Sequence, residues 1–171
     1  MNTAAQQILS HTPIWVWVLL AGLIALGLKQ SRDRVIKRTP LVVLPMALGL
    51  SSLAGATSAF GARPAVLLLW VFGATVGIWA YTILKLPLRA QALPNGRFAI
   101  GGSWLPMAML LGVFTLRYVV SAALAVDPAL ARTAGFAAIA GGLYGLMAGL
   151  FAGRALRVLA QAPKGAVPLA A

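Results

Sequence analysis

The chain has 171 residues, of which 61% are hydrophobic and 9% are charged. A soluble domain carries about 25% charged residues, so this composition excludes a water-facing surface and predicts a protein embedded in a bilayer. The net charge is +12, but the basic residues lie between long apolar segments and do not gather on one aromatic-rich face, so we expect no nucleic-acid partner.

The residue types that usually hold metals and redox cofactors are nearly missing. The sequence has no cysteine and a single histidine, His11. This excludes thiol–disulfide exchange, thiolate and iron–sulfur centres, and a zinc or copper site built by one chain alone. We therefore expect neither a metal nor a cofactor.

Five apolar segments predict an all-α bundle of five transmembrane helices, because a membrane-spanning helix needs about 20 apolar residues. The first segment is short, and the fifth has Asp127 as its expected N-cap. We expect a single domain over residues 1–161, followed by a flexible tail over 162–171. The expected spans are 13–28, 40–60, 64–84, 104–126 and 128–153.

The basic residues predict the orientation of the bundle. Eleven of the fourteen lie in the first connection, around the third, or at the C-terminal end, whereas the other connections hold only Arg63 and Arg132. The positive-inside rule then puts the N-terminus outside and the C-terminus in the cytoplasm. Residues 1–12 carry no basic residue, so we expect an uncleaved anchor, not a signal peptide. The expected cytoplasmic basic face, a partner for anionic lipid headgroups, comprises Lys29, Arg32, Arg34, Lys37, Arg38, Arg89, Arg97, Arg154 and Arg157.

The largest predicted loop is cytoplasmic and contains a turn signal. Asn95-Gly96 lies between two partly alternating segments, a pattern typical of a β-hairpin. We therefore consider a short hairpin over residues 88–100. An irregular loop at the membrane interface is an equally good interpretation.

The fifth span contains a glycine every four residues, which places the four glycines on one helix face. Small residues at this spacing let two membrane helices approach closely. We favour packing within the bundle over a seam with a second copy or another membrane protein. The glycines are Gly141, Gly145, Gly149 and Gly153.

Arg117 is the one charged residue well inside a predicted span. A charge near the bilayer centre costs about 2.5–3.5 kcal/mol, so it needs a partner. Asp127 is about 15 Å further along a straight helix, beyond direct contact. We favour a structural arginine bonded to carbonyls or hydroxyls. The alternative is a site for an anionic ligand, with Tyr118 beside it.

Several motifs in the second half occur together: Gly102-Ser103-Trp104-Leu105-Pro106, Arg117-Tyr118, Asp127-Pro128, Tyr144-Gly145-Leu146 and the run from Gly149 to Leu156. Over about residues 100–157 the chain resembles an uncharacterised family of small bacterial inner-membrane proteins, which implies no particular activity. It is remotely similar to CcdC-type membrane proteins, linked by name to cytochrome c biogenesis, in topology and in a Gly-Ser pair before a span. The chain has no cysteine, and a direct role in thiol chemistry would require one.

The predicted function follows from what the spans lack. They contain no carboxylate relay, no nucleophile–base pair and no phosphate-binding loop, so we expect no enzyme. The leading hypothesis is a non-enzymatic accessory or interaction protein of the bacterial inner membrane. The alternative is a small transporter or channel for an anionic or neutral solute, with Arg117 at its site. A redox-enzyme subunit, the third class, would need cofactor ligands from a partner.

Overall fold

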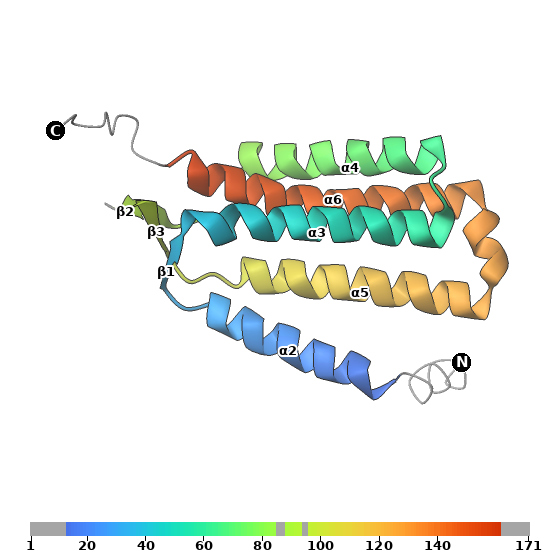
Figure 1. The fold of residues 1–171 in the computed structure, drawn as a ribbon, viewed down its shortest axis with the longest axis horizontal. Helices are drawn as coiled ribbons and strands as arrows, with labels where there is room; N and C mark the ends of the chain where they lie inside the picture. The colour runs from blue at the N-terminus through green and yellow to red at the C-terminus, as the bar shows by residue number, and fades with distance from the viewer. Residues whose placement is uncertain (1–12, 85–87, 94–95, 162–171) are drawn as a thin grey trace.

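The computed structural model describes residues 13–84, 88–93 and 96–161 (Figure 1). Four of the described helices are long and apolar enough to cross a membrane, and a fifth, α2, is shorter at 17 residues. The helices are α2 (Ile14–Gln30), α3 (Arg38–Phe60), α4 (Pro64–Ile83), α5 (Leu105–Val126), the short 3-10 helix η2 (Pro128–Arg132) and α6 (Ala134–Leu159). The strands are β1 (Arg34–Lys37), β2 (Ala90–Leu93) and β3 (Arg97–Ile100).

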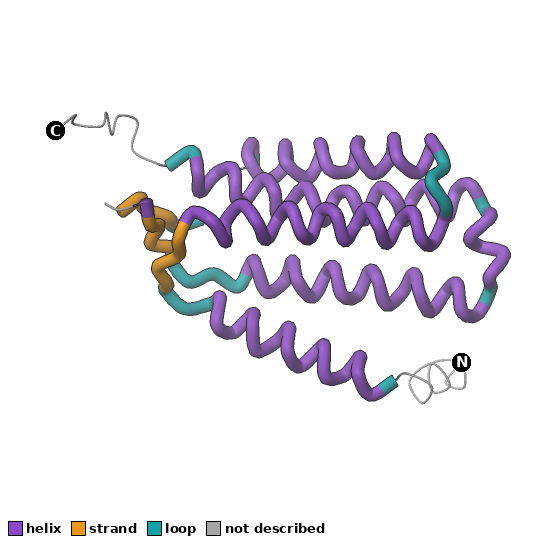
Figure 2. The backbone as a smooth tube through the Cα atoms, viewed as in Figure 1, coloured by secondary structure: helices purple, strands orange, loops and turns teal. Residues whose placement is uncertain are grey.

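The five long helices lie side by side, and the strands gather at one end of the bundle, as Figure 2 shows. Helix α6 packs most extensively against α4 and then against α3, whereas α2 packs chiefly against α5. Helix α2 is outermost and diverges from α5 toward its N-terminal end (Figure 1). Large apolar side chains such as Leu68, Phe72 and Trp79 are exposed on α4. Such flanks are suited to a hydrocarbon solvent.

The fifth long helix differs from its prediction at both ends. Asp127 caps the 3-10 helix, where its Oδ1 accepts a hydrogen bond of 2.9 Å from the backbone N–H of Ala129. Thr133 is then extended, with φ −73° and ψ 113°, and α6 begins only at Ala134. The prediction of 128–153 was therefore wrong, because one Asp-Pro cap can start a short turn as well as a long helix. No proline follows Gly153 closely, so α6 continues to Leu159.

The hairpin considered for residues 88–100 is present. Strands β2 and β3 pair antiparallel from Ala90 opposite Ile100 to Leu93 opposite Arg97. Gly96 has a φ of +67°, a backbone conformation that residues other than glycine rarely adopt. Asn95, the other half of the predicted turn, lies outside the described residues.

A third strand, β1, lies in the connection between the first two predicted spans and was not predicted from the sequence. It pairs antiparallel with the other edge of β3, which gives the order β1-β3-β2. The segment Arg-Val-Ile-Lys is short and alternating, and its partner lies far along the chain, so local pattern does not reveal it. Phe98 and Ile100 on β3 pack in one buried cluster with Leu41, Ala155 and Val158 of the helix ends. This support stabilises a sheet that would be marginal alone.

Candidate functional site

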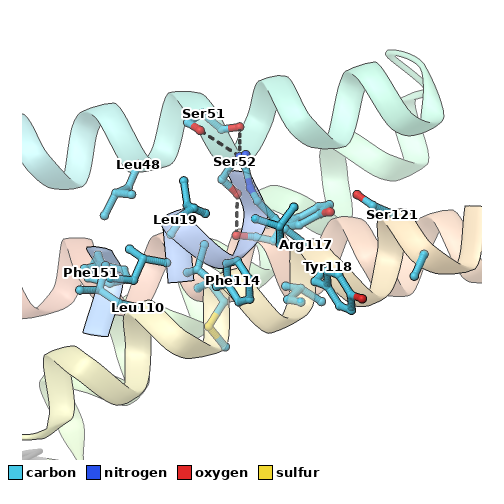
Figure 3. A pocket seen from close by; sticks show the side chains of 18 of the residues that line it. Leu19, Leu48, Ser51, Ser52, Leu110, Phe114, Arg117, Tyr118, Ser121 and Phe151 are labelled. Atoms are coloured by element: carbon cyan, nitrogen blue, oxygen red, sulfur yellow. Dashed lines mark hydrogen bonds between the residues drawn. The ribbon is translucent and has the colours of Figure 1, made fainter. Parts of the chain in front are cut away.

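A cavity of about 960 Å³ lies between α2, α3, α5 and α6. Its volume is near the upper end of the range of roughly 300–1,000 Å³ found for ligand sites. Most of its wall is apolar, with Leu19, Leu48, Leu110, Phe114 and Phe151 among the lining side chains (Figure 3). The polar lining residues are Ser51, Ser52, Arg117, Tyr118, Ser121 and Tyr144.

The cavity is bounded on one side by α2, which packs closely on α5 only near the sheet. Near the sheet, Gly27 of α2 lies so close to Met107 of α5 that an added Cβ would overlap the Met107 side chain. Toward its other end α2 diverges from α5 (Figure 1). The space between them reaches from Phe151 and Leu110 in mid-bundle to Pro13 and Val126 at the end away from the sheet. One wall of the cavity is therefore formed by the part of α2 that includes Val16, Leu19 and Leu23.

Arg117 supplies the positive charge of this cavity. Its Nη2 donates to the backbone carbonyl of Ser51 and, over 2.9 Å, to the Ser51 hydroxyl (Figure 3). Gly55, one turn further along α3, leaves room for the guanidinium, because a Cβ there would lie 3.2 Å from Nη2. A guanidinium carries five N–H donors, so these two acceptors leave donors for a further partner.

A second polar link stands beside Arg117 and joins three helices. The buried Ser52 hydroxyl donates to the backbone carbonyl of Tyr144 over 2.8 Å and accepts a hydrogen bond of 3.2 Å from Nε1 of Trp70. These bonds connect α3 to α6 and α4 and fix the wall on which Ser51 lies. Neither serine was singled out as a partner in the sequence. The pattern that could have indicated these partners is a Ser-Ser pair inside an apolar helix, with Gly55 one turn away.

Tyr118, predicted beside Arg117, also lines the cavity. Its ring stacks on Phe114 with centroids 6.2 Å apart and an interplanar angle of 11°. Figure 3 shows Phe114, Tyr118 and Ser121 along α5 on the same side as Arg117. Within the described ranges, no three His, Cys, Asp or Glu side chains lie together as metal ligands would. The chemistry that these groups offer is recognition of an anion and of hydrocarbon.

The four glycines predicted to share one helix face form a ridge on α6, which lies against α4 and outside the cavity. An added Cβ at Gly145 would overlap the backbone of Trp70, and one at Gly149 would overlap the backbone of Ala74. The other ridge positions, Gly141 and Gly153, face Val66 and Ile78 of α4. All four glycines therefore lie against α4 of the same chain.

The predicted basic face gathers at the sheet end of the bundle. Three of its members do not lie on an open surface, however, because Arg34, Arg154 and Arg157 are half-buried. Burial, and then the positive charge of neighbouring Arg154, lower the pKa of Arg34 below its usual value. An arginine nonetheless stays protonated in proteins. The members on the open surface are Lys29, Arg32, Lys37, Arg38, Arg89 and Arg97.

The long apolar helices with exposed apolar flanks are those expected of a helical membrane protein. The model of a family of unknown function (DUF6622) matches residues 3–168, and the chain belongs to this family. A stretch of 42 residues is 49% identical to an uncharacterized protein of Pasteurella multocida (strain Pm70). That match covers 25% of this chain and 33% of the relative, so it spans about a third of the relative's length. No solved structure matches the chain.

These comparisons support the expected family of small uncharacterised bacterial proteins. They do not show the similarity to CcdC-type proteins. They assign no activity to this chain, so its function is inferred from the cavity.

Proposed function

We propose that the protein is a non-enzymatic binding protein of the bacterial inner membrane, which holds an anionic amphiphile in the Arg117 cavity on behalf of a membrane-protein partner. The ligand has one acidic head, a carboxylate or a phosphodiester, and a hydrocarbon chain. The observation that carries the proposal is a single guanidinium in the wall of a large cavity whose other lining residues are uncharged and mostly apolar.

The charge balance around Arg117 favours an anionic ligand. Ser51 offers it dipoles but no negative charge. The two acidic residues of the chain are used elsewhere: Asp33 accepts from the backbone of Gly102, and Asp127 caps η2. A charge held in a low-dielectric region without a counterion is costly, and a bound anion would offset that cost. The apolar walls would accept its chain.

The proposed orientation has five spans, with the sheet end in the cytoplasm. Helix α2 is about 26 Å long at 1.5 Å per residue, slightly less than the hydrocarbon core of about 30 Å. Exposed apolar side chains such as Val18 and Leu26 suit it to lipid. The basic residues at the sheet end support a cytoplasmic location and contact with anionic headgroups, since only Arg63 and Arg132 lie at the other end.

The cavity wall also supports binding over transport in this proposal. A path for a hydrated solute requires polar groups along its length. Here the polar groups cluster around Arg117, and the wall toward both ends is mainly aliphatic or aromatic. This supports retention of an amphiphile over passage of a small solute. Among the lining residues, the hydroxyls have no histidine, carboxylate or lysine beside them to act as a base, which supports a non-catalytic role.

Binding of oleate and of its uncharged counterpart, oleyl alcohol, by the purified protein in dodecyl maltoside tests the proposal. We expect saturable binding of one oleate per chain and at least about tenfold weaker binding by Arg117→Leu, because the charge-assisted bonds are lost. Oleyl alcohol should bind more weakly, and equally, to both proteins. The control is Arg132→Leu, which removes an exposed arginine that does not line the cavity. Equal oleate affinity in wild type and Arg117→Leu would overturn the proposal.

A further inference from the structure

The lining of the Arg117 cavity changes character along the axis of the bundle. On the side of Arg117 that faces the sheet, every described lining residue is apolar. Figure 3 shows three of them, Leu48, Leu110 and Phe151, together on that side. We call this part of the cavity the apolar compartment. Its wall also includes Val113, Met147 and Ala148.

Hydroxyl groups line the cavity at Arg117 and on its other side. Ser51 lies level with the guanidinium, to which it is hydrogen-bonded. Tyr118 and Ser121 follow Arg117 along α5 in the direction away from the sheet, as Figure 3 shows. The cavity is therefore polar at and beyond the arginine and apolar toward the sheet, which gives an amphiphile a preferred direction.

The apolar compartment is closed at its sheet end. Leu110 and Phe151 have only 7% and 6% of their surface exposed, and they belong to a buried cluster with Met109 and Tyr81. Side chains packed behind these two residues leave no passage toward the sheet. At the other end of the cavity the lining residue Val126 is 73% exposed, so that end is not closed in the same way.

The helix geometry gives the depth of the compartment. Leu110 precedes Arg117 by two helical turns on α5, which at 1.5 Å per residue is about 10 Å along the axis. An extended hydrocarbon chain advances about 1.3 Å per carbon, because a bond of about 1.5 Å is inclined to the chain axis. The compartment therefore accepts about eight extended carbons beyond a head at Arg117.

Filling this compartment is what distinguishes the two possible directions of a bound chain. A chain directed away from the sheet would pass Tyr118 and Ser121 toward the exposed end and leave the compartment empty. An apolar void stays dry and lacks the dispersion contacts of a packed interior. A chain directed toward the sheet gains those contacts, and each buried CH₂ group improves the affinity about fourfold.

We infer that the bound amphiphile holds its acidic head at Arg117 and directs its chain toward the sheet, where Phe151 and Leu110 end the straight path after about eight carbons. This inference rests on the proposed function and adds to it the direction of the ligand and the residues that set its chain length. A longer chain, such as that of oleate, has to bend inside the cavity of about 960 Å³, so carbons beyond this depth add less affinity.

Two substitutions that add the same bulk on opposite sides of Arg117 test the direction. Ala148→Leu narrows the apolar compartment one turn before Phe151, and Ala122→Leu narrows the cavity on the side away from the sheet. Hexanoate and decanoate compete with tritiated decanoate for the purified full chain in dodecyl maltoside. The ratio of each variant's Kd to that of wild type is compared for the two acids, because partition into the micelles cancels in this ratio.

The direction of the chain predicts a different result for each variant. Ala148→Leu should bind hexanoate within about twofold of wild type and decanoate at least about tenfold more weakly, since only the longer chain reaches the added side chain. Ala122→Leu should weaken both acids by the same factor. If wild type binds neither acid saturably, the proposed function fails and the inference fails with it. If wild type binds but the ratio rises with chain length in Ala122→Leu, or fails to rise in Ala148→Leu, the inference alone is overturned.

Photolabelling of the wild type provides the test if Ala148→Leu cannot be purified. Decanoate with a diazirine at its penultimate carbon is bound, irradiated, and located by mass spectrometry of peptides. We expect the label at Leu110, Phe151 or their neighbours in the apolar compartment. A label at Ala125 or Val126 would overturn the inference and leave the binding of an anionic amphiphile intact.

Discussion

Arg117 on α5 is hydrogen-bonded to Ser51 on α3 through both the backbone carbonyl and the side-chain hydroxyl of the serine. The two helices make few other close backbone approaches, because α5 packs chiefly against α2 and α6. This pair of bonds therefore does two things. It satisfies part of the guanidinium inside an apolar bundle, and it fixes the arginine against the wall of the cavity.

The Arg117–Ser51 link should be visible in stability. Ser51→Ala removes the hydroxyl acceptor but keeps the carbonyl, so we expect a loss of about 0.5–1.5 kcal/mol. Arg117→Leu removes both bonds and should cost about 1–3 kcal/mol, with partial rescue by Arg117→Lys, which keeps the charge but not the planar fork. Denaturant-induced unfolding in mixed micelles measures these differences. If Arg117→Leu unfolds like wild type, the arginine does not hold α3 to α5.

The contact of α6 with α4 predicts a contrast between two glycines of the same helix. Gly145→Ala should destabilise the protein by about 1–3 kcal/mol, because its Cβ would overlap the Trp70 backbone. Gly135→Ala is the matched control, since no atom lies within 4 Å of its added Cβ. It should be close to neutral, because Gly135 is the second residue of α6 and the full gain from helix propensity applies to helix interiors. Thermal unfolding in detergent distinguishes the two, and equal stability would show that α6 does not pack on α4 as described.

The strand β1 can be tested by a disulfide, because the chain contains no cysteine. Val35 and Ala99 are register partners across β1 and β3. Directly opposed residues have Cβ atoms about 4.5–5.5 Å apart, close to the range that a disulfide spans. The pair Val35→Cys and Ala99→Cys should therefore cross-link under mild oxidation, as seen by electrophoretic mobility. Gln91→Cys with Val35→Cys is the control: Gln91 pairs with the other edge of Ala99, one strand further away, and efficient cross-linking of this pair would contradict the strand order.

The helices could be predicted from the sequence because length and hydropathy are local properties. The hairpin could be considered from the sequence because Asn95-Gly96 marks a turn within one short segment, although an irregular loop fitted the same pattern equally well. Strand β1 could not be, because its pairing with β3 is a contact between distant segments. The start of α6 was misjudged for another reason: Asp127 and Pro128 fit a 3-10 helix as well as the first turn of an α-helix.

Only part of the candidate site could be predicted from the sequence. Arg117 stands out as a charge in an apolar span, and its need for carbonyl or hydroxyl partners follows from desolvation. That Ser51 supplies both partners depends on the relative rotation of α3 and α5. The cavity depends on the divergence of α2, which no residue pattern encodes directly.

The five-span proposal predicts which positions an impermeant maleimide reaches in right-side-out spheroplasts. Single cysteines replacing Pro13 and Ala62, both exposed, should be labelled from outside. A cysteine replacing the exposed Ala160 should be labelled only after lysis. The Pro13 position is the most informative, because α2 is the shortest of the long helices. If Pro13→Cys and Ala160→Cys are both protected until lysis while Ala62→Cys is labelled, α2 does not cross the membrane.

The central claim is that the Arg117 cavity holds one anionic amphiphile, and native mass spectrometry of protein released from its own membrane tests it most directly. Wild type and Arg132→Leu should each carry one adduct of an anionic amphiphile per chain. The adduct should be absent from Arg117→Leu, which lacks the charge. It should also be absent from Ala122→Trp, which keeps the charge but fills space at a lining residue. Wild type without any adduct, or an adduct retained equally by Arg117→Leu and Ala122→Trp, would contradict the account.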